Sequence, residues 1–153
     1  MTITIRSAST ADIARLAALR RAYTAERHEL SAGADPDFER RFRAWWEQVE
    51  PCSVSWLAED GALPVGMLSL LVLPRMPSPG RRTGSLGYLP LLYVRPDRRD
   101  RGLGRRLLEA AFDHARRHDI AKIILRPTER AAGLYRRAGF RPGGDHLVWR
   151  HEP

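Results

Sequence analysis

Residues 94–108 decide the fold, and they read VRPDRRDRGLGRRLL. An apolar run at 87–94 leads into them, and a helical pattern of apolar residues follows as far as Phe112. We therefore expect a short loop, with Gly102 and Gly104, that joins a strand to the N-terminus of a helix. Such a joint binds anions, because the first helical turn has unpaired N–H groups and glycines let a phosphate approach the backbone closely.

Two widespread phosphate loops do not fit this segment. A P-loop requires a Lys-Ser or Lys-Thr pair, which the chain lacks, and a dinucleotide fingerprint requires a third glycine where Leu107 stands. The spacing present is Arg99-x-x-Gly102-x-Gly104, five residues after Val94. It resembles the acetyl-coenzyme A loop of the GNAT superfamily of N-acetyltransferases. Taken alone, the same spacing also fits a simple helix-entry turn.

A second motif lies further along the chain. Residues 123–125 are predicted to form a short strand, after which Thr128 caps a helix over 129–138 that ends at a left-handed Gly139. The segment AAGLYRRAGF, residues 131–140, resembles the second GNAT signature and stands in its expected place. Two ordered motifs at this separation favour the family over coincidence.

The resemblance covers nearly the whole chain. Residues 3–12 look like the usual first strand and helix start of the family, and only 25–52 has no recognisable counterpart. A chain of 153 residues is long enough for one domain and too short for two of ordinary size. We expect a single GNAT-like N-acetyltransferase domain over residues 1–153.

Composition narrows the location and the chemistry. No apolar run approaches the roughly 20 residues of a membrane helix, so we expect a cytoplasmic protein without a membrane partner. Cys52 is the only cysteine, which excludes an internal disulfide and a multi-thiolate zinc site. His114 and His118 lie four apart on a predicted helix, but no third ligand is evident, so no metal is expected.

The net charge of +8 comes almost wholly from arginine, since Lys122 is the only lysine. A nucleic-acid binder that uses the arginines of 98–106 is one alternative. That cluster coincides with the predicted phosphate loop, where a multiply phosphorylated cofactor already accounts for it. We therefore do not expect a nucleic-acid partner.

The pattern of elements indicates an α/β fold of the GNAT type. Strands are predicted at 2–6, 53–59, 64–73, 87–94 and 121–126, helices at 10–24, 36–48, 103–118 and 129–138, and a final strand pair between 140 and 150. Asp60-Gly61 predicts a hairpin, and the helix at 103–118 predicts a right-handed crossover. We expect a central, mostly antiparallel sheet with one splayed parallel pair and helices on both faces. The proline-rich connection 74–86 is either a mobile loop or a substrate lid.

The resemblance implies acetyl-coenzyme A as the cofactor and gives its contacts. The implied cofactor residues are Leu92, Tyr93, Val94, Arg99, Asp100, Arg101, Gly102, Leu103, Gly104, Arg105, Thr128 and Tyr135. Leu92 and Val94 would pair with the pantetheine arm beside a bulge, which Pro90 supports because proline cannot donate to a ladder. Tyr135 would be the general acid for the departing thiolate. Thr128 stands where the family often has asparagine.

The general base is not evident from the sequence. Tyr88, Pro90, Leu92 and Val94, taken as one face of their strand, include no carboxylate, although many relatives have a glutamate there. A base elsewhere, a water relay and a weakly basic amine are the alternatives. The candidates elsewhere are Glu26, His28, Glu29 and Glu59.

The acceptor is expected to be a primary amine of a small molecule or peptide, attacked directly in a ternary complex. The lack of acids predicts an acceptor of low positive charge with apolar surface, or one whose carboxylate meets Arg81 or Arg82. The candidate substrate residues are Glu26, Glu29, Trp45 and Tyr88. A catalytically weak coenzyme A-binding regulatory module is the alternative function, and a homodimer is possible.

Overall fold

The structure is a computed structural model that describes residues 2–28, 33–144 and 146–151. Its strands are β1 (Ile3–Ser7), β2 (Ser53–Asp60), β3 (Leu63–Pro74), β4 (Ser85–Val94), β5 (Ile120–Leu125), β6 (Arg141–Gly143) and β7 (His146–Arg150). Its helices are α1 (Ile13–His28), α2 (Phe38–Val49), α3 (Leu103–Arg117) and α4 (Ala132–Arg137), with short 3-10 turns at Thr10–Asp12, Glu50–Cys52 and Pro96–Arg98. Within the described ranges, no helix is both long and apolar enough to cross a membrane.

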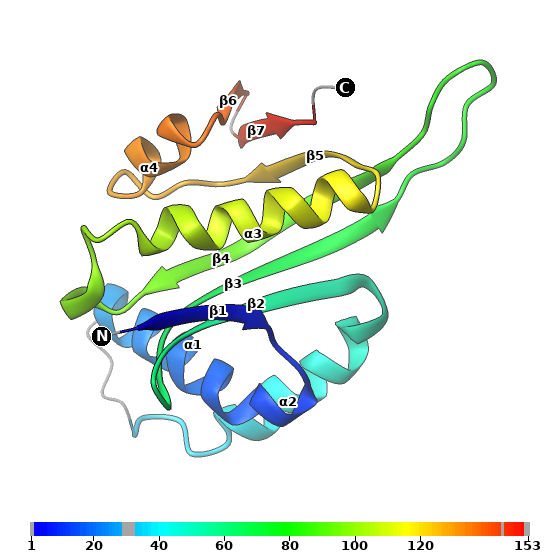
Figure 1. Ribbon diagram of the computed structural model, residues 1–153. Helices are drawn as coiled ribbons and strands as arrows, with labels where there is room; N and C mark the ends of the chain where they lie inside the picture. The colour runs from blue at the N-terminus through cyan, green and yellow to red at the C-terminus, as the bar shows by residue number, and fades with distance from the viewer. Residues whose placement is uncertain (1, 29–32, 145, 152–153) are drawn as a thin grey trace.

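The strands form one seven-stranded sheet in the order β1-β2-β3-β4-β5-β7-β6 (Figure 1). All neighbours are antiparallel except β4 and β5, which are parallel and joined through α3. The predicted hairpin joins β2 to β3, with Gly61 at a positive φ of 61°. The mixed sheet with one parallel pair confirms the predicted fold class.

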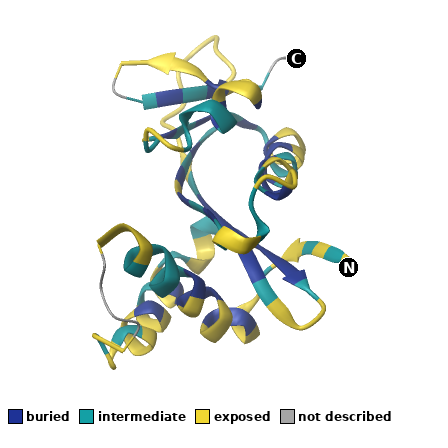
Figure 2. Cartoon of the chain, turned by 90° about the vertical axis from the view of Figure 1, so that its left-hand side faces the viewer, coloured by how far each residue is buried: buried dark blue, intermediate teal, exposed yellow. Residues whose placement is uncertain are grey.

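Helices cover both faces of the sheet, and each face has its own core. Residues of α1 and α2 form the α1-side core: Ile13, Leu16, Ala17, Leu19, Phe42 and Trp46, with Leu57, Met67, Leu91 and Tyr93 of the sheet. Residues of α3 and α4 pack on the opposite face in the α3-side core, which includes Leu68, Leu89, Phe112, Ile123, Tyr135, Phe140 and Trp149. Figure 2 shows the buried residues on the sides of the helices that meet the sheet.

A bulge interrupts β4 at its centre. The pairing with β3 passes from Ser69 opposite Leu91 to Leu71 opposite Tyr88, so β4 has one extra residue. Pro90 lies there and is exposed, which suits a residue that cannot donate to the ladder. Beyond Tyr88, β4 no longer pairs with β5, so the parallel strands separate as predicted.

The bulge also corrects the predicted face of β4. Leu89 belongs to the α3-side core, whereas Leu91 belongs to the α1-side core, because an extra residue reverses the alternation. Tyr88 therefore shares its face with Leu91 and not with Leu92. The grouping of Tyr88 with Leu92 and Val94 was wrong.

Two helices differ from their predicted limits, and the remaining elements agree within two residues. The helix predicted at 10–24 is α1, and it extends to His28 because no glycine or proline stops it. The helix predicted at 129–138 is α4, which begins only at Ala132 because a turn precedes it. Thr128 closes that turn, since its Oγ1 accepts a hydrogen bond from the N–H of Ala131 (3.3 Å). The longer α1 changes the site described below.

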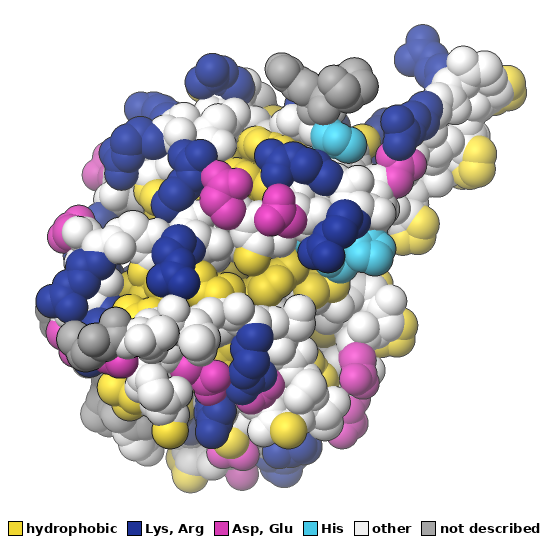
Figure 3. All heavy atoms as spheres, viewed as in Figure 1, with side chains coloured by type: hydrophobic (Ala, Val, Ile, Leu, Met, Phe, Trp, Pro, Cys, Tyr) yellow, Lys and Arg dark blue, Asp and Glu magenta, His cyan; other side chains and the backbone are white. Residues whose placement is uncertain are grey.

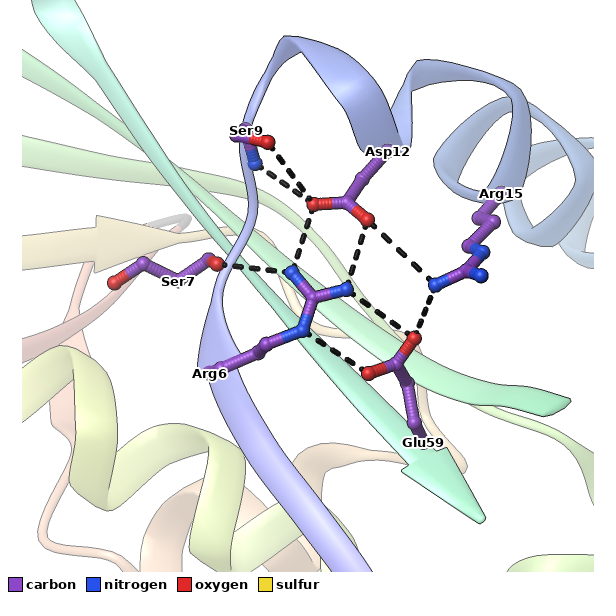
Figure 4. A network of polar contacts seen from close by, with 6 residues as sticks. All are labelled: Arg6, Ser7, Ser9, Asp12, Arg15 and Glu59. Carbon is purple, nitrogen blue, oxygen red and sulfur yellow. Dashed lines mark hydrogen bonds and ion pairs between the residues drawn. The ribbon is translucent and has the colours of Figure 1, made fainter. Parts of the chain in front are cut away.

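A polar network fixes the start of α1 against the sheet (Figure 4). The Arg6 guanidinium donates two hydrogen bonds to Asp12, both of 2.8 Å, and two to Glu59, of 3.0 and 3.2 Å. Arg15 pairs with Glu59 at 2.5 Å. The bonds from Arg6 lower the pKa of Asp12 to about 2. The carboxylate of Glu59 is thus bonded to Arg6 of β1 and Arg15 of α1, so it is not free to act as the base.

The connection between β3 and β4 continues their hairpin away from the body of the protein (Figure 1). Arg82 on this arm pairs with Asp119 at 2.7 Å. No residue of the arm lines the cleft described below. The positions of these residues favour neither a lid over that cleft nor a role for Arg82 in holding the acceptor.

Candidate active site

A cleft of about 760 Å³ opens where β4 and β5 separate. Three groups of residues line it. They are Tyr23, Glu26 and Arg27 of α1; Leu92, Tyr93, Val94, Arg98, Arg99, Asp100, Gly102, Leu103, Gly104 and Arg105 of β4, the following loop and α3; and Thr128, Arg130, Ala131, Gly133, Leu134, Tyr135 and Arg137 around α4. A volume of this size suits a small-molecule ligand.

The loop before α3 has the backbone of an anion cradle. Asp100 and Gly102 both adopt positive φ, of 60° and 75°, and α3 begins without a side-chain cap. The N–H groups of the first turn, at Leu103, Gly104 and Arg105, therefore have no helical acceptor. Alternating left-handed residues and a free helix start together form a concave set of donors.

The two glycines keep this cradle open. A Cβ at Gly102 would meet no atom within 4 Å, and its left-handed φ disfavours other residues. A Cβ at Gly104 would lie 3.0 Å from Cδ2 of Leu134, across the cleft on α4. The residues present thus fit a phosphate-bearing cofactor that passes between α3 and α4.

Arg99 holds the loop in place. Its Nε donates to the carbonyl of Val94 (2.9 Å), and its two terminal nitrogens donate to the carboxylate of Glu26 (2.7 and 2.8 Å). Arg130 adds a third bond to Glu26 (3.0 Å). The bond from Arg99, and then the neighbouring charges, lower the pKa of Glu26. Glu26 is therefore an ionised bridge between both walls of the cleft and a weak proton acceptor.

Tyr135 lies in the wall formed by α4 and is 5% exposed. Its carbonyl accepts the N–H of Phe140 (3.0 Å), and Gly139 adopts φ of 104°, so the helix end fixes its position. Burial, and then the phenol of Tyr23, raise the pKa of the Tyr135 hydroxyl. The hydroxyl stays protonated at neutral pH and has no hydrogen-bond partner within the described ranges. It is available as a donor to a ligand.

Most of the predicted cofactor residues meet in this cleft. Leu92, Tyr93, Val94, Arg99, Asp100, Gly102, Leu103, Gly104, Arg105, Thr128 and Tyr135 all line it, and so does Glu26. Leu103 is only 3% exposed, so it contributes chiefly backbone. The Arg101 side chain is exposed and lies outside the cleft lining.

Two of the predicted substrate residues, Trp45 and Tyr88, do not line the cleft. Trp45 instead packs against Phe42 on α2. Tyr88 precedes the bulge and still pairs with Ile124, so it lies where the strands have not separated. Glu29 lies outside the described residues.

Eight residues that line the cleft were not among the predicted site residues: Tyr23, Arg27, Arg98, Arg130, Ala131, Gly133, Leu134 and Arg137. Tyr23 and Arg27 occupy one side of α1, and Arg130 and Leu134 flank the turn and first residues of α4. The spacing Tyr23-x-x-Glu26-Arg27 would have placed these side chains together had the helix been extended to His28. The Arg99–Glu26 contact spans 73 residues, and no local pattern indicates it.

The remaining charged groups do not form a metal site or a continuous basic stripe over α3. No cluster of three His, Cys, Asp or Glu suited to a metal occurs within the described ranges. His114 and His118 stack at 4.2 Å, and burial lowers the pKa of His114. On the face that shows α3, basic and acidic side chains alternate (Figure 3), as in the Arg105–Glu109 pair at 2.7 Å.

The uncapped start of α3 behind a glycine loop, the separated parallel strand pair and the opposing phenol of Tyr135 are the features that the resemblance to the GNAT family implied. The sequence pattern of the Acetyltransferase (GNAT) family matches residues 16–140. The chain therefore belongs to the GNAT acetyltransferase family, as its two motifs predicted.

Individual relatives agree with this membership. The chain is 31% identical over 132 residues to glucosamine 6-phosphate N-acetyltransferase 1 of Oryza sativa, with 82% of this chain and 76% of that protein covered. It is 27% identical over 157 aligned residues to a probable N-acetyltransferase of Mycobacterium tuberculosis, covering 97% and 85%. A predicted acetyltransferase of Clostridium acetobutylicum, solved with acetyl-CoA, shares the fold with a TM-score of 0.77, 19% identity and coverage of 99% and 96%.

Proposed function

We propose that this protein transfers an acetyl group from acetyl-coenzyme A to a primary amine of a small molecule, by direct attack within a ternary complex. The observation that carries the proposal is the single cleft that joins the α3 cradle, the free edge of β4 and the Tyr135 hydroxyl. When bound, acetyl-coenzyme A supplies an acyl thioester as the group to be transferred. Ternary binding supplies the close placement that direct attack requires.

Backbone groups provide most of the cofactor contacts in this proposal. The first turn of α3, at Gly102 to Arg105, offers its free N–H groups to the pyrophosphate. The edge of β4 at Leu92 and Val94 has lost β5 as a partner and offers backbone groups to the pantetheine arm. A backbone N–H near Leu92 is suited to polarise the thioester carbonyl.

Tyr135 is the proposed hydrogen-bond donor to the sulfur that leaves the thioester. Its hydroxyl is a fixed donor that remains protonated across the working pH range. Donation to the thiolate as it departs lowers the barrier to its loss. The raised pKa makes the phenol a weak acid. We therefore assign Tyr135 two roles: it donates a hydrogen bond that stabilises the sulfur, and it delivers the proton.

The amine loses its proton without a dedicated carboxylate in this proposal. The low pKa and three guanidinium bonds of Glu26 make it a poor base, and Glu59 lies in the separate network with Arg6. β4 itself has no acidic residue. We therefore assign the proton to water in the open cleft, one of the alternatives that the sequence left open.

A small-molecule amine is the favoured acceptor because the rice relative is named for glucosamine 6-phosphate. Tyr23, Tyr93 and Tyr135 give the cleft an aromatic character that suits an acceptor with apolar surface. A peptide amine remains a second possible acceptor. A cytoplasmic location and a homodimer stay predictions from the sequence.

The test follows free thiol while the protein is incubated with acetyl-coenzyme A and a panel of primary amines. Thiol release that depends on both protein and amine supports the proposal. Thermal stabilisation by acetyl-coenzyme A without thiol release across the panel would instead favour a coenzyme A-binding regulatory module. Duplex DNA binding that falls steeply with salt, without cofactor binding, would favour the nucleic-acid alternative.

A further inference from the structure

The last two turns of α1 form one wall of the cleft. The rings of Tyr23 and Tyr93 meet edge to face with centroids 5.9 Å apart, and both tyrosines line the cleft together with Tyr135. Glu26 and Arg27 follow Tyr23 on the same side of the helix and also line the cleft. This wall therefore faces the same cleft as Tyr135.

Six guanidinium groups and two carboxylates, those of Glu26 and Asp100, line the cleft. Arg99 is fully engaged, with one bond to Val94 and two to Glu26. Arg130 shares the same Glu26 carboxylate through one bond and keeps 70% of its side chain exposed. Glu26 is thus already matched by Arg99, and the charge of Arg130 is largely uncompensated.

Arg27 has no carboxylate partner within the described ranges. Its terminal nitrogen donates to the Tyr23 hydroxyl (2.5 Å), and its guanidinium lies 5.4 Å from the centroid of that ring. Arg27, Arg99 and Arg130 lie around the Glu26 carboxylate, and the other carboxylate of the cleft, Asp100, accepts a hydrogen bond from none of them within the described ranges. The guanidinium charges around Glu26 therefore exceed its carboxylate charge by two.

We propose that the acceptor has an anionic group, a phosphate or a carboxylate, in addition to its amine, and that Arg130 and Arg27 bind this group. The inference rests on the proposed acetyl transfer. A guanidinium presents a planar fork of donors that matches either anion, and a polycationic acceptor would meet repulsion at this wall. Glu26 then orients Arg130 and does not contact the acceptor's cation.

The experiment compares matched acceptors that differ only in the anion. One pair is glucosamine 6-phosphate and glucosamine, and a second is an amino acid and its amide. We expect kcat/KM with acetyl-coenzyme A to be at least tenfold higher for the anionic member of one pair. Arg130→Gln, and separately Arg27→Gln, should lower that ratio severalfold to tenfold. Arg136→Gln is the matched control, because Arg136 is exposed on α4 and does not line the cleft.

Binding provides a readout that does not depend on turnover. Calorimetry on the protein loaded with coenzyme A should show the same preference for the anionic member and the same loss in Arg130→Gln. Turnover with equal kcat/KM for both members of each pair would overturn the inference and leave the proposed function standing. Preferential binding without any thiol release would support the anion site and refute the proposed function. An Arg130→Gln variant that loses acetyl-coenzyme A affinity as strongly as acceptor preference would assign Arg130 to the cofactor and overturn the inference.

Discussion

Replacing Gly104 by valine should block the cradle between α3 and α4. The Cβ alone would lie 3.0 Å from Cδ2 of Leu134, and we expect the two further methyl groups of valine to narrow the space between α3 and α4. A hydrogen bond to a charged group is worth about 1.5–3 kcal/mol, so losing one or two of them costs about 3 kcal/mol. The dissociation constant for acetyl-coenzyme A should rise about 100-fold, as measured by calorimetry.

Two further variants separate the possible causes of this loss. Gly104→Ala adds only the Cβ, which meets the flexible end of Leu134, so its affinity should fall by less than about tenfold. Leu134→Ala in the Gly104→Val background removes the neighbour on α4 and should not restore binding. Full rescue by Leu134→Ala would show that displacement of α4 causes the loss. An unchanged dissociation constant in Gly104→Val would refute the cradle.

Three other perturbations have defined outcomes. Tyr135→Phe should lower kcat about 100-fold with little change in acetyl-coenzyme A affinity, and an equal kcat in single-turnover reactions would make Tyr135 a packing residue. Because no enzyme carboxylate takes the proton, the pH profile of kcat/KM should shift with the pKa of the acceptor amine, and one fixed midpoint for two different amines would contradict this. Asp12→Asn should lower the free energy of unfolding by about 2 kcal/mol at pH 7, since the folded pKa of about 2 lies below the unfolded value of 3.8. This stabilisation is lost as pH falls from about 4 to about 2, so urea unfolding at pH 2 should no longer separate the two proteins, and an equal difference at both pH values would count against the network with Arg6.

The cradle and the helix ends were predictable because glycine marks them. Gly102 and Gly104 open the turn before α3, and Gly139 ends α4, each at a place where a side chain would clash or strain the backbone. These local signals need no knowledge of distant contacts. They were sufficient to identify the family and to predict a cofactor site at the first turn of α3.

The other wall of the cleft was not predictable to the same extent. A bulge reverses the alternation of β4, and Pro90 indicated the bulge without indicating which residues change faces. α1 has no stop signal between Thr24 and His28, so ending it early left Glu26 outside the helix. The charge state of Glu26 depends on Arg99, and only the tertiary structure brings those two residues together.

The most direct test of the central claim is an NMR titration of amide-labelled protein with acetyl-coenzyme A. A second hollow provides the internal comparison, and it is lined by Arg116, Gly139, Arg141, Pro142, Gly143, Val148, Trp149 and Arg150. The account predicts the largest shifts at the amides of Gly102 and Gly104, with Val94 next and the second hollow nearly unchanged. Saturable shifts centred on the second hollow, with Gly102 and Gly104 unmoved, would contradict it.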